Sequence, residues 1–147
     1  MSAIEHSKPL EIELQLPVKT YDIDFAGIVS NIVYVRWLED LRLEMLSTFL
    51  PLEEQLQNGI APIVLQTNID YKQSIQLSDR PIGKMWIASL AALRWSVGAE
   101  ISSAGKTSAI AQQMGIFINL ETKKPIRIPE RLQQQYHESL SRSNSCK

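Results

Sequence analysis

Cysteine and histidine are scarce in the 147-residue sequence, which has one cysteine and two histidines. Cys146 lies in the C-terminal tail, so the sequence offers neither a disulfide framework nor a cysteine cluster for a metal ion. His6 and His137 lie near the two ends. A Ser-His-Asp triad, a Cys-His pair and a zinc-dependent hydrolase therefore find no support, because each needs histidine or cysteine beside the site. No G-x-S-x-G elbow is present either. A carboxylate remains as the available catalytic group.

An excess of basic residues is also missing, because 15 Lys and Arg face 16 Asp and Glu and give a net charge of −1. Nucleic-acid binding would need a basic face, so we expect no nucleic-acid partner. No apolar run is long enough to span a bilayer, and the first residues show no apolar signal core. We therefore expect a cytoplasmic protein without a membrane partner. The 44% hydrophobic and 21% charged content is ordinary, and the length predicts one domain over residues 1–147.

The most strongly patterned stretch is a predicted helix that begins at Ser30 or Asn31, both good N-cap residues, and ends before Pro51. Apolar residues recur along one broad face at helical spacing: Tyr34, Trp37, Leu38, Leu41, Met45 and Phe49. Further apolar residues extend this face most of the way round, which predicts a helix that is covered on most sides. Arg36 and Asp40 are four residues apart and predict a small ion pair on the exposed strip.

An acidic turn with Asp22, Asp24 and Gly27 comes directly before this helix. Glycine can adopt a positive φ at no steric cost, which suits a tight turn. The unpaired N–H groups at the helix start and their partial positive charge point back at the turn. The two carboxylates either cap the helix or take part in acid–base or nucleophilic chemistry, in which the free N–H groups hold a developing oxyanion.

The rest of the chain predicts strands with little helix. Apolar residues alternate with polar ones, or β-formers cluster between turns, over residues 11–20, 63–72, 82–90, 94–102 and 107–120. Gly115 marks a bulge or a crowded point, and Trp86 and Trp95 are expected in the sheet core. A short helix is expected over residues 130–140, with flexible ends over 1–10 and 141–147. One strand, a long helix and four strands in meander order predict an antiparallel α+β domain.

Eight spaced residues around the acidic turn form the pattern D-x-D-x-x-G-x-V-x-N-x-x-Y-x-x-W-x-E: Asp22, Asp24, Gly27, Val29, Asn31, Tyr34, Trp37 and Glu39. This pattern closely resembles the signature of hotdog-fold acyl-CoA thioesterases, and the best match is the 4-hydroxybenzoyl-CoA thioesterase branch. The resemblance implies a hotdog fold, in which one curved antiparallel sheet of about five strands wraps the long central helix.

The resemblance also implies roles for the residues of the turn. The second aspartate of the D-x-D pair is the catalytic carboxylate of that branch, and it falls on Asp24. Asp24 would act as nucleophile or general base on an acyl-CoA or acyl carrier protein thioester. Backbone N–H groups of Val29, Ser30 and Asn31 would form the oxyanion hole.

Three further residues would support this site. Asp22 would shape the turn or act on Asp24 through like-charge proximity. Gly27 would allow the turn, and Tyr34 would place its hydroxyl near it. No metal and no bound cofactor are expected, because coenzyme A would be part of the substrate.

The resemblance further implies a homodimer that covers the exposed sheet edge, with sites at the interface, and often a tetramer. The main alternative is a hotdog-fold protein that binds an acyl thioester without hydrolysing it. Against that alternative, a binder has no reason to place a carboxylate next to an electrophilic carbonyl. A hotdog dehydratase would carry a catalytic histidine on or before the helix, where this sequence has none. A purely structural module is the third option.

Overall fold

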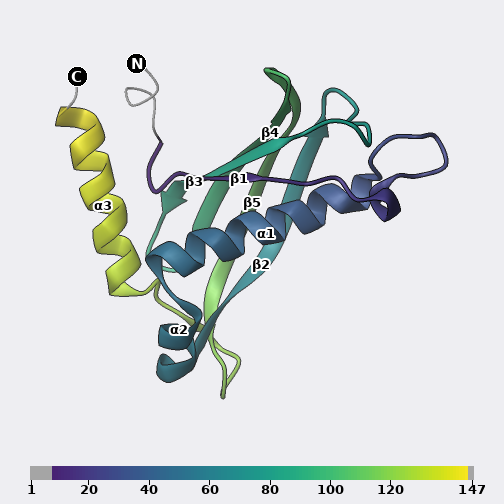
Figure 1. Cartoon of the computed structure of the whole chain (residues 1–147). Coiled ribbons are helices and arrows are strands. Elements are labelled where there is room, and N and C mark those ends of the chain that lie inside the picture. The colour runs from purple at the N-terminus through teal and green to yellow at the C-terminus, as the bar shows by residue number, and fades with distance from the viewer. Residues whose placement is uncertain (1–7, 146–147) are drawn as a thin grey trace.

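The computed structural model describes residues 8–145 and has one long helix wrapped by a curved antiparallel sheet (Figure 1). The elements follow in this order: β1 (Ile12–Gln15), a 3₁₀ turn η2 (Thr20–Asp22), α1 (Asn31–Phe49), α2 (Leu52–Asn58), β2 (Ile60–Tyr71), β3 (Ile82–Leu90), β4 (Trp95–Ser103), β5 (Lys106–Asn119), β6 (Pro125–Ile126) and α3 (Glu130–Ser145). The predicted α+β class, with a long helix held in a curved sheet, is confirmed.

The strand order of the sheet differs from the predicted meander. The main path is β1-β3-β4-β5-β2, and the short β6 pairs with the end of β5. Only β3, β4 and β5 follow one another as a meander, because β2 pairs with β5 rather than with β3. The connection over residues 72–81 carries the chain from one edge of the sheet to the other. There β3 pairs with the short edge strand β1.

This connection passes beneath the start of α1 and helps to hold it. Ile75 is fully buried in it, and its carbonyl oxygen accepts a hydrogen bond of 2.8 Å from the Val29 N–H. The connection is long because β4 and β5 lie between β2 and β3, so it has to cross from the β2 edge to the β3 side of the sheet. Through Ile75 it also supplies core contacts to the start of α1.

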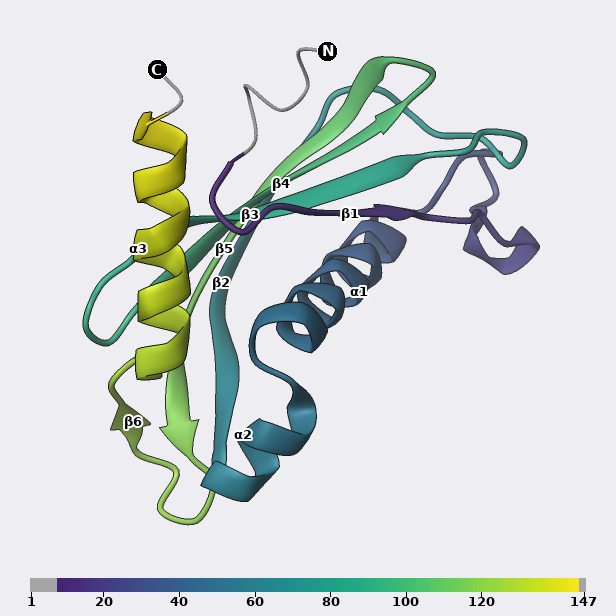
Figure 2. The same ribbon diagram turned by 60° about the vertical axis from the view of Figure 1, so that its left-hand side comes forward.

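The α1 helix occupies the concave face of the sheet (Figure 2). Its N-cap is Ser30, as predicted, and its predicted face packs inward: Tyr34, Trp37, Leu38, Leu41 and Met45 are buried, and Phe49 is half-buried. In the single chain, however, Ile32, Val35 and Leu43 stay exposed along the outer side of the helix. The prediction that α1 is covered on most sides is therefore not met by this chain alone.

Gly115 is the crowded point that the sequence predicted, although the register shift lies on the neighbouring strand between Val64 and Gln66. A Cβ at Gly115 would lie 2.0 Å from the Ile63 carbonyl oxygen and 2.3 Å from the Trp95 ring. Trp95 is buried and donates its ring N–H to the Ile116 carbonyl at 3.0 Å. Only glycine fits here because the indole lies directly against the β5 backbone.

The C-terminal helix is longer than predicted, since α3 continues to Ser145 rather than ending near residue 140. Its Leu132 is buried in the main core, which anchors the first turns. The predicted flexible segment 1–10 is described only from Lys8. Leu10 is buried, and its N–H donates to the Ser139 hydroxyl oxygen at 3.3 Å. The remaining terminal residues, 1–7 and 146–147, lie outside the described residues.

Candidate functional site

Asp24 holds the acidic turn together with one of its two carboxylate oxygens. Its Oδ1 accepts the backbone N–H groups of Ala26 at 2.9 Å and Ile28 at 3.4 Å. Gly27 has a φ of +83°, which lets its own N–H reach the Asp24 carbonyl at 3.0 Å. The other oxygen, Oδ2, has no hydrogen-bond partner among the described residues. The side chain is therefore fixed in direction and still has an oxygen available for chemistry.

Asp22 is a structural residue of the turn. It is 3% exposed, and its Oδ1 accepts the Arg36 guanidinium at 2.7 Å while its Oδ2 accepts the Lys19 N–H at 2.9 Å. Its carbonyl oxygen accepts the Ser30 N–H at 2.9 Å. Arg36 thus pairs with Asp22 rather than with Asp40, which corrects the ion pair expected from helical spacing. Both oxygens of Asp22 are in use, so this carboxylate fixes the start of α1.

The three predicted oxyanion donors differ in their partners. The N–H groups of Val29 and Ser30 already donate to the carbonyl oxygens of Ile75 and Asp22, at 2.8 and 2.9 Å. The N–H of Asn31 has no acceptor among the described residues, as expected for the first residue of a helix. Asn31 is therefore the one residue of the predicted trio whose N–H can receive a new acceptor without breaking a bond seen here.

Two tyrosines pack against each other at the start of α1, one buried and one exposed. Tyr34 is buried, and the Tyr71 ring meets it edge-on with centroids 5.0 Å apart and an 87° angle between the rings. The Tyr71 hydroxyl donates to the Asn31 carbonyl at 3.3 Å. Burial raises the pKa of Tyr34, and the nearby Tyr71 raises it further. Burial also raises the pKa of Tyr71, so both phenols are neutral at neutral pH.

Tyr71 is the site residue that the sequence did not identify. At the end of a predicted strand, Asp70, Tyr71 and Lys72 could supply polar groups near a site, but a surface role is the favoured interpretation, and all three are indeed exposed. The closeness of Tyr71 to the helix start follows from the place of β2 at the sheet edge beside β5, which no local pattern shows.

An open groove of about 390 Å³ adjoins the turn on the side of Asp22 and Arg36. Residues of β1 and the following loop line it together with Trp37 and Asp40 of α1. Within residues 8–145, no group of three or more His, Cys, Asp or Glu side chains is placed to hold a metal ion. In the same range, no helix has the length and hydrophobicity needed to cross a membrane.

The site therefore combines a fixed carboxylate with an unoccupied helix N–H, on a long helix held in a curved sheet. The family model of the Thioesterase-like superfamily matches residues 18–136, which include all of these groups. The chain belongs to the Thioesterase-like superfamily. This assignment agrees with the resemblance that the D-x-D motif carries.

One curated relative of this chain is the chloroplastic acyl-acyl carrier protein thioesterase ATL3 of Arabidopsis thaliana. The two sequences are 25% identical over 126 residues, which cover 84% of this chain. The match spans 66% of the length of the Arabidopsis protein.

Solved structures confirm the hotdog architecture. The protein SAV2348 of Staphylococcus aureus, solved in complex with CoA, superposes with a TM-score of 0.83 at 16% identity, over 92% of this chain and 87% of that chain. A DHNA-CoA thioesterase of Staphylococcus aureus gives a TM-score of 0.75 at 26% identity, over 92% and 90%. The 1,4-dihydroxy-2-naphthoyl-CoA thioesterase Slr0204 of Synechocystis gives 0.77 at 23% identity, over 87% and 96%.

Proposed function

We propose that this protein is a thioester hydrolase that acts on an acyl-CoA or acyl carrier protein conjugate. The observation that carries the proposal is the placement of Asp24 in a Thioesterase-like chain: one oxygen is fixed by the turn, the other is available, and α1 begins directly after the turn.

The reaction adds an oxygen nucleophile to the thioester carbonyl carbon and breaks the carbon–sulfur bond. Asp24 either attacks the carbonyl carbon itself or takes a proton from the attacking water. If Asp24 is the base, the proton that it takes from water passes to the departing thiolate, and the acyl group leaves as the free acid. If Asp24 is the nucleophile, the departing thiolate leaves an acyl–Asp24 anhydride and takes a proton from water, and a second water then hydrolyses the anhydride to the free acid and the Asp24 carboxylate. The negative charge that develops on the carbonyl oxygen is stabilised by the N–H of Asn31 and the positive end of the helix dipole. We assign this role to Asn31 rather than to Val29 or Ser30, whose N–H groups are occupied.

We further propose that the working unit is a homodimer formed across the β2 edge. β2 is a 12-residue strand at the edge of the sheet, and it carries exposed Ile63 and Leu65. The exposed α1 residues Ile32, Val35 and Leu43 form one stripe, spaced by three and eight residues. Such an edge and such a stripe are covered in a stable protein, and a second copy covers both.

Contacts of the neighbouring helix residues Asn31 and Arg42 support a position of this stripe near the β2 edge. The Arg42 guanidinium donates to the Gln113 side chain at 2.7 Å, and Gln113 donates to the Thr67 hydroxyl of β2 at 3.1 Å. Tyr71 of β2 also bonds the Asn31 carbonyl. Antiparallel pairing of two β2 edges therefore brings two α1 helices side by side. Association of dimers into a tetramer and a cytoplasmic location stay predictions.

Thiol release from acyl-CoAs and acyl carrier protein conjugates tests the proposed hydrolase. We expect the wild-type protein to turn over at least one thioester repeatedly, with equal amounts of thiol and acid formed. The alternative is a protein that binds acyl thioesters and leaves them intact. Saturable binding of a non-hydrolysable thioether analogue, without thiol release from any of the matching thioesters, would favour that alternative.

A further inference from the structure

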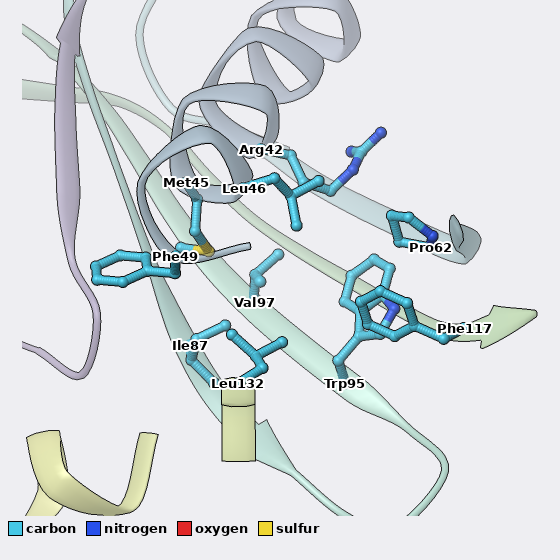
Figure 3. Close-up of a pocket in the computed structure, with 10 residues that line it drawn as sticks. All are labelled: Arg42, Met45, Leu46, Phe49, Pro62, Ile87, Trp95, Val97, Phe117 and Leu132. Atoms are coloured by element: carbon cyan, nitrogen blue, oxygen red, sulfur yellow. The ribbon is translucent and has the colours of Figure 1, made fainter. Parts of the chain in front are cut away.

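A small apolar cavity lies between the C-terminal half of α1 and the sheet (Figure 3). Its volume is about 30 Å³, close to the space that one methyl group fills. Ten residues line it: Arg42, Met45, Leu46, Phe49, Pro62, Ile87, Trp95, Val97, Phe117 and Leu132. Arg42 is the one charged residue among them, and its guanidinium donates hydrogen bonds to Gln113 and Glu39. The cavity is therefore lined by hydrocarbon.

Within one chain this cavity is remote from Asp24. Asn31 begins α1, and Arg42, the first helix residue to line the cavity, lies about 16 Å further along the helix axis. The cavity lies instead beside Pro62, near the N-terminal end of β2. The candidate site lies at the C-terminal end of the same strand, where Tyr71 bonds the Asn31 carbonyl.

The proposed dimer removes this separation. When two β2 strands pair antiparallel, the N-terminal half of one strand runs beside the C-terminal half of the other. In such a dimer the cavity next to Pro62 of one protomer lies near the helix start and the acidic turn of the partner. An acyl group whose thioester is bound at the partner's site can therefore extend towards the cavity of the first protomer.

We propose that this cavity receives the methyl end of an aliphatic acyl chain whose thioester is bound at the site of the other protomer. The inference rests on the proposed function and names its substrate class as aliphatic rather than aromatic thioesters. The cavity of about 30 Å³ is too small for an aromatic ring, because a cavity that holds benzene is on the order of 150 Å³. The hydroxyls of a hydroxylated ring would in addition lie against hydrocarbon without a hydrogen-bond partner. A straight chain fills a narrow apolar space and leaves no polar group unpaired.

Two substitutions change the cavity in opposite directions. Val97→Leu adds one methylene group to the central wall and closes the cavity. Leu132→Ala removes the wall that α3 supplies and enlarges it. Leu140→Ala is the matched control, because it makes the same change on the same helix at a residue that does not line the cavity.

The measurement is kcat/KM of the wild-type protein and the three variants for butanoyl-, octanoyl-, hexadecanoyl- and benzoyl-CoA. Thermal melts confirm that each variant is folded at the assay temperature. We expect the wild type to prefer an aliphatic substrate over benzoyl-CoA. Val97→Leu should lower the ratio of long-chain to butanoyl-CoA kcat/KM by about tenfold, the usual effect of one misplaced methylene in a tight apolar pocket. Leu132→Ala should move the preference to longer chains, and Leu140→Ala should keep the wild-type ratio.

The results separate this inference from the proposed function. If the wild-type protein releases no thiol from any thioester, the proposed function fails and the inference fails with it. If the wild type is active but prefers benzoyl-CoA, only the inference is overturned. It is also overturned if folded Val97→Leu and Leu132→Ala proteins both keep the wild-type chain-length ratio.

Discussion

The ion pair between Arg36 and Asp22 should stabilise the start of α1 far more than its place near the surface suggests. The Asp22 side chain is 3% exposed, whereas the Arg36 side chain is 52% exposed. In Arg36→Met the buried Asp22 carboxylate loses its 2.7 Å charged donor and keeps only the Lys19 N–H. A hydrogen bond to a charged group is worth about 1.5–3 kcal/mol, and water can partly replace a half-exposed guanidinium. We therefore expect a loss of about 2 kcal/mol.

A double-mutant cycle isolates this interaction. Arg36→Met, Asp22→Asn and the double variant are compared by urea unfolding at one fixed protein concentration, because association would shift the apparent stability. The expected coupling energy is about 1–2 kcal/mol. The control is Asp40→Asn, which removes the partner that helical spacing favours and should change stability by less than about 0.5 kcal/mol. A coupling energy near zero, or an Asp40→Asn loss equal to that of Arg36→Met, would refute the assigned pairing.

Four other predictions follow, three from the packing of the chain and one from the proposed dimer. Gly115→Ala should abolish folding or cost more than about 4 kcal/mol, because its Cβ would lie 2.0 Å from a backbone oxygen, and it is checked by circular dichroism and urea unfolding. Gly98→Ala should cost less, since its Cβ would meet the half-buried Trp86 ring at 2.6 Å and this side chain can shift; equal losses would contradict this. Burial raises the pKa of the Tyr34 phenol above 10.0 in the folded chain. The stability that comes from keeping this phenol neutral should therefore be complete below pH 10 and lost as the pH rises through the folded-state pKa. Urea midpoints of Tyr34→Phe should therefore fall less than those of the wild type above pH 10. Leu65→Lys on the β2 edge should convert the proposed dimer to a monomer in light scattering, and an unchanged dimer mass would place the interface elsewhere.

The sequence predicted the individual helices and strands of this fold better than it predicted which strands pair with one another. The apolar spacing from Tyr34 to Phe49 identifies α1, and the predicted strand Ile82–Leu90 matches β3 at both ends. These features depend on local periodicity, which the order of residues records directly. The pairing of β2 with β5 does not depend on local periodicity. It depends on where the ten-residue connection before β3 crosses the fold.

The same limit applies to the candidate site. The motif identified Asp24 and the start of α1 as neighbours because they are close in sequence. It did not show that Val29 and Ser30 use their N–H groups within the chain, since the acceptor of Val29, Ile75, lies 46 residues further on. Tyr71 was missed for the same reason. Contacts that depend on strand order can be predicted only from the whole topology, whereas a capping turn can be predicted from its own residues.

The most direct test of the central claim is the thiol-release rate of Asp24→Asn on the best wild-type substrate. Asparagine keeps an Oδ1 that can accept the Ala26 and Ile28 N–H groups, so the turn should keep its shape, and an unchanged melting temperature checks this. We predict that kcat falls by at least about 100-fold, the scale for loss of a general base or nucleophile. A folded Asp24→Asn protein that hydrolyses the thioester at the wild-type rate would contradict the account.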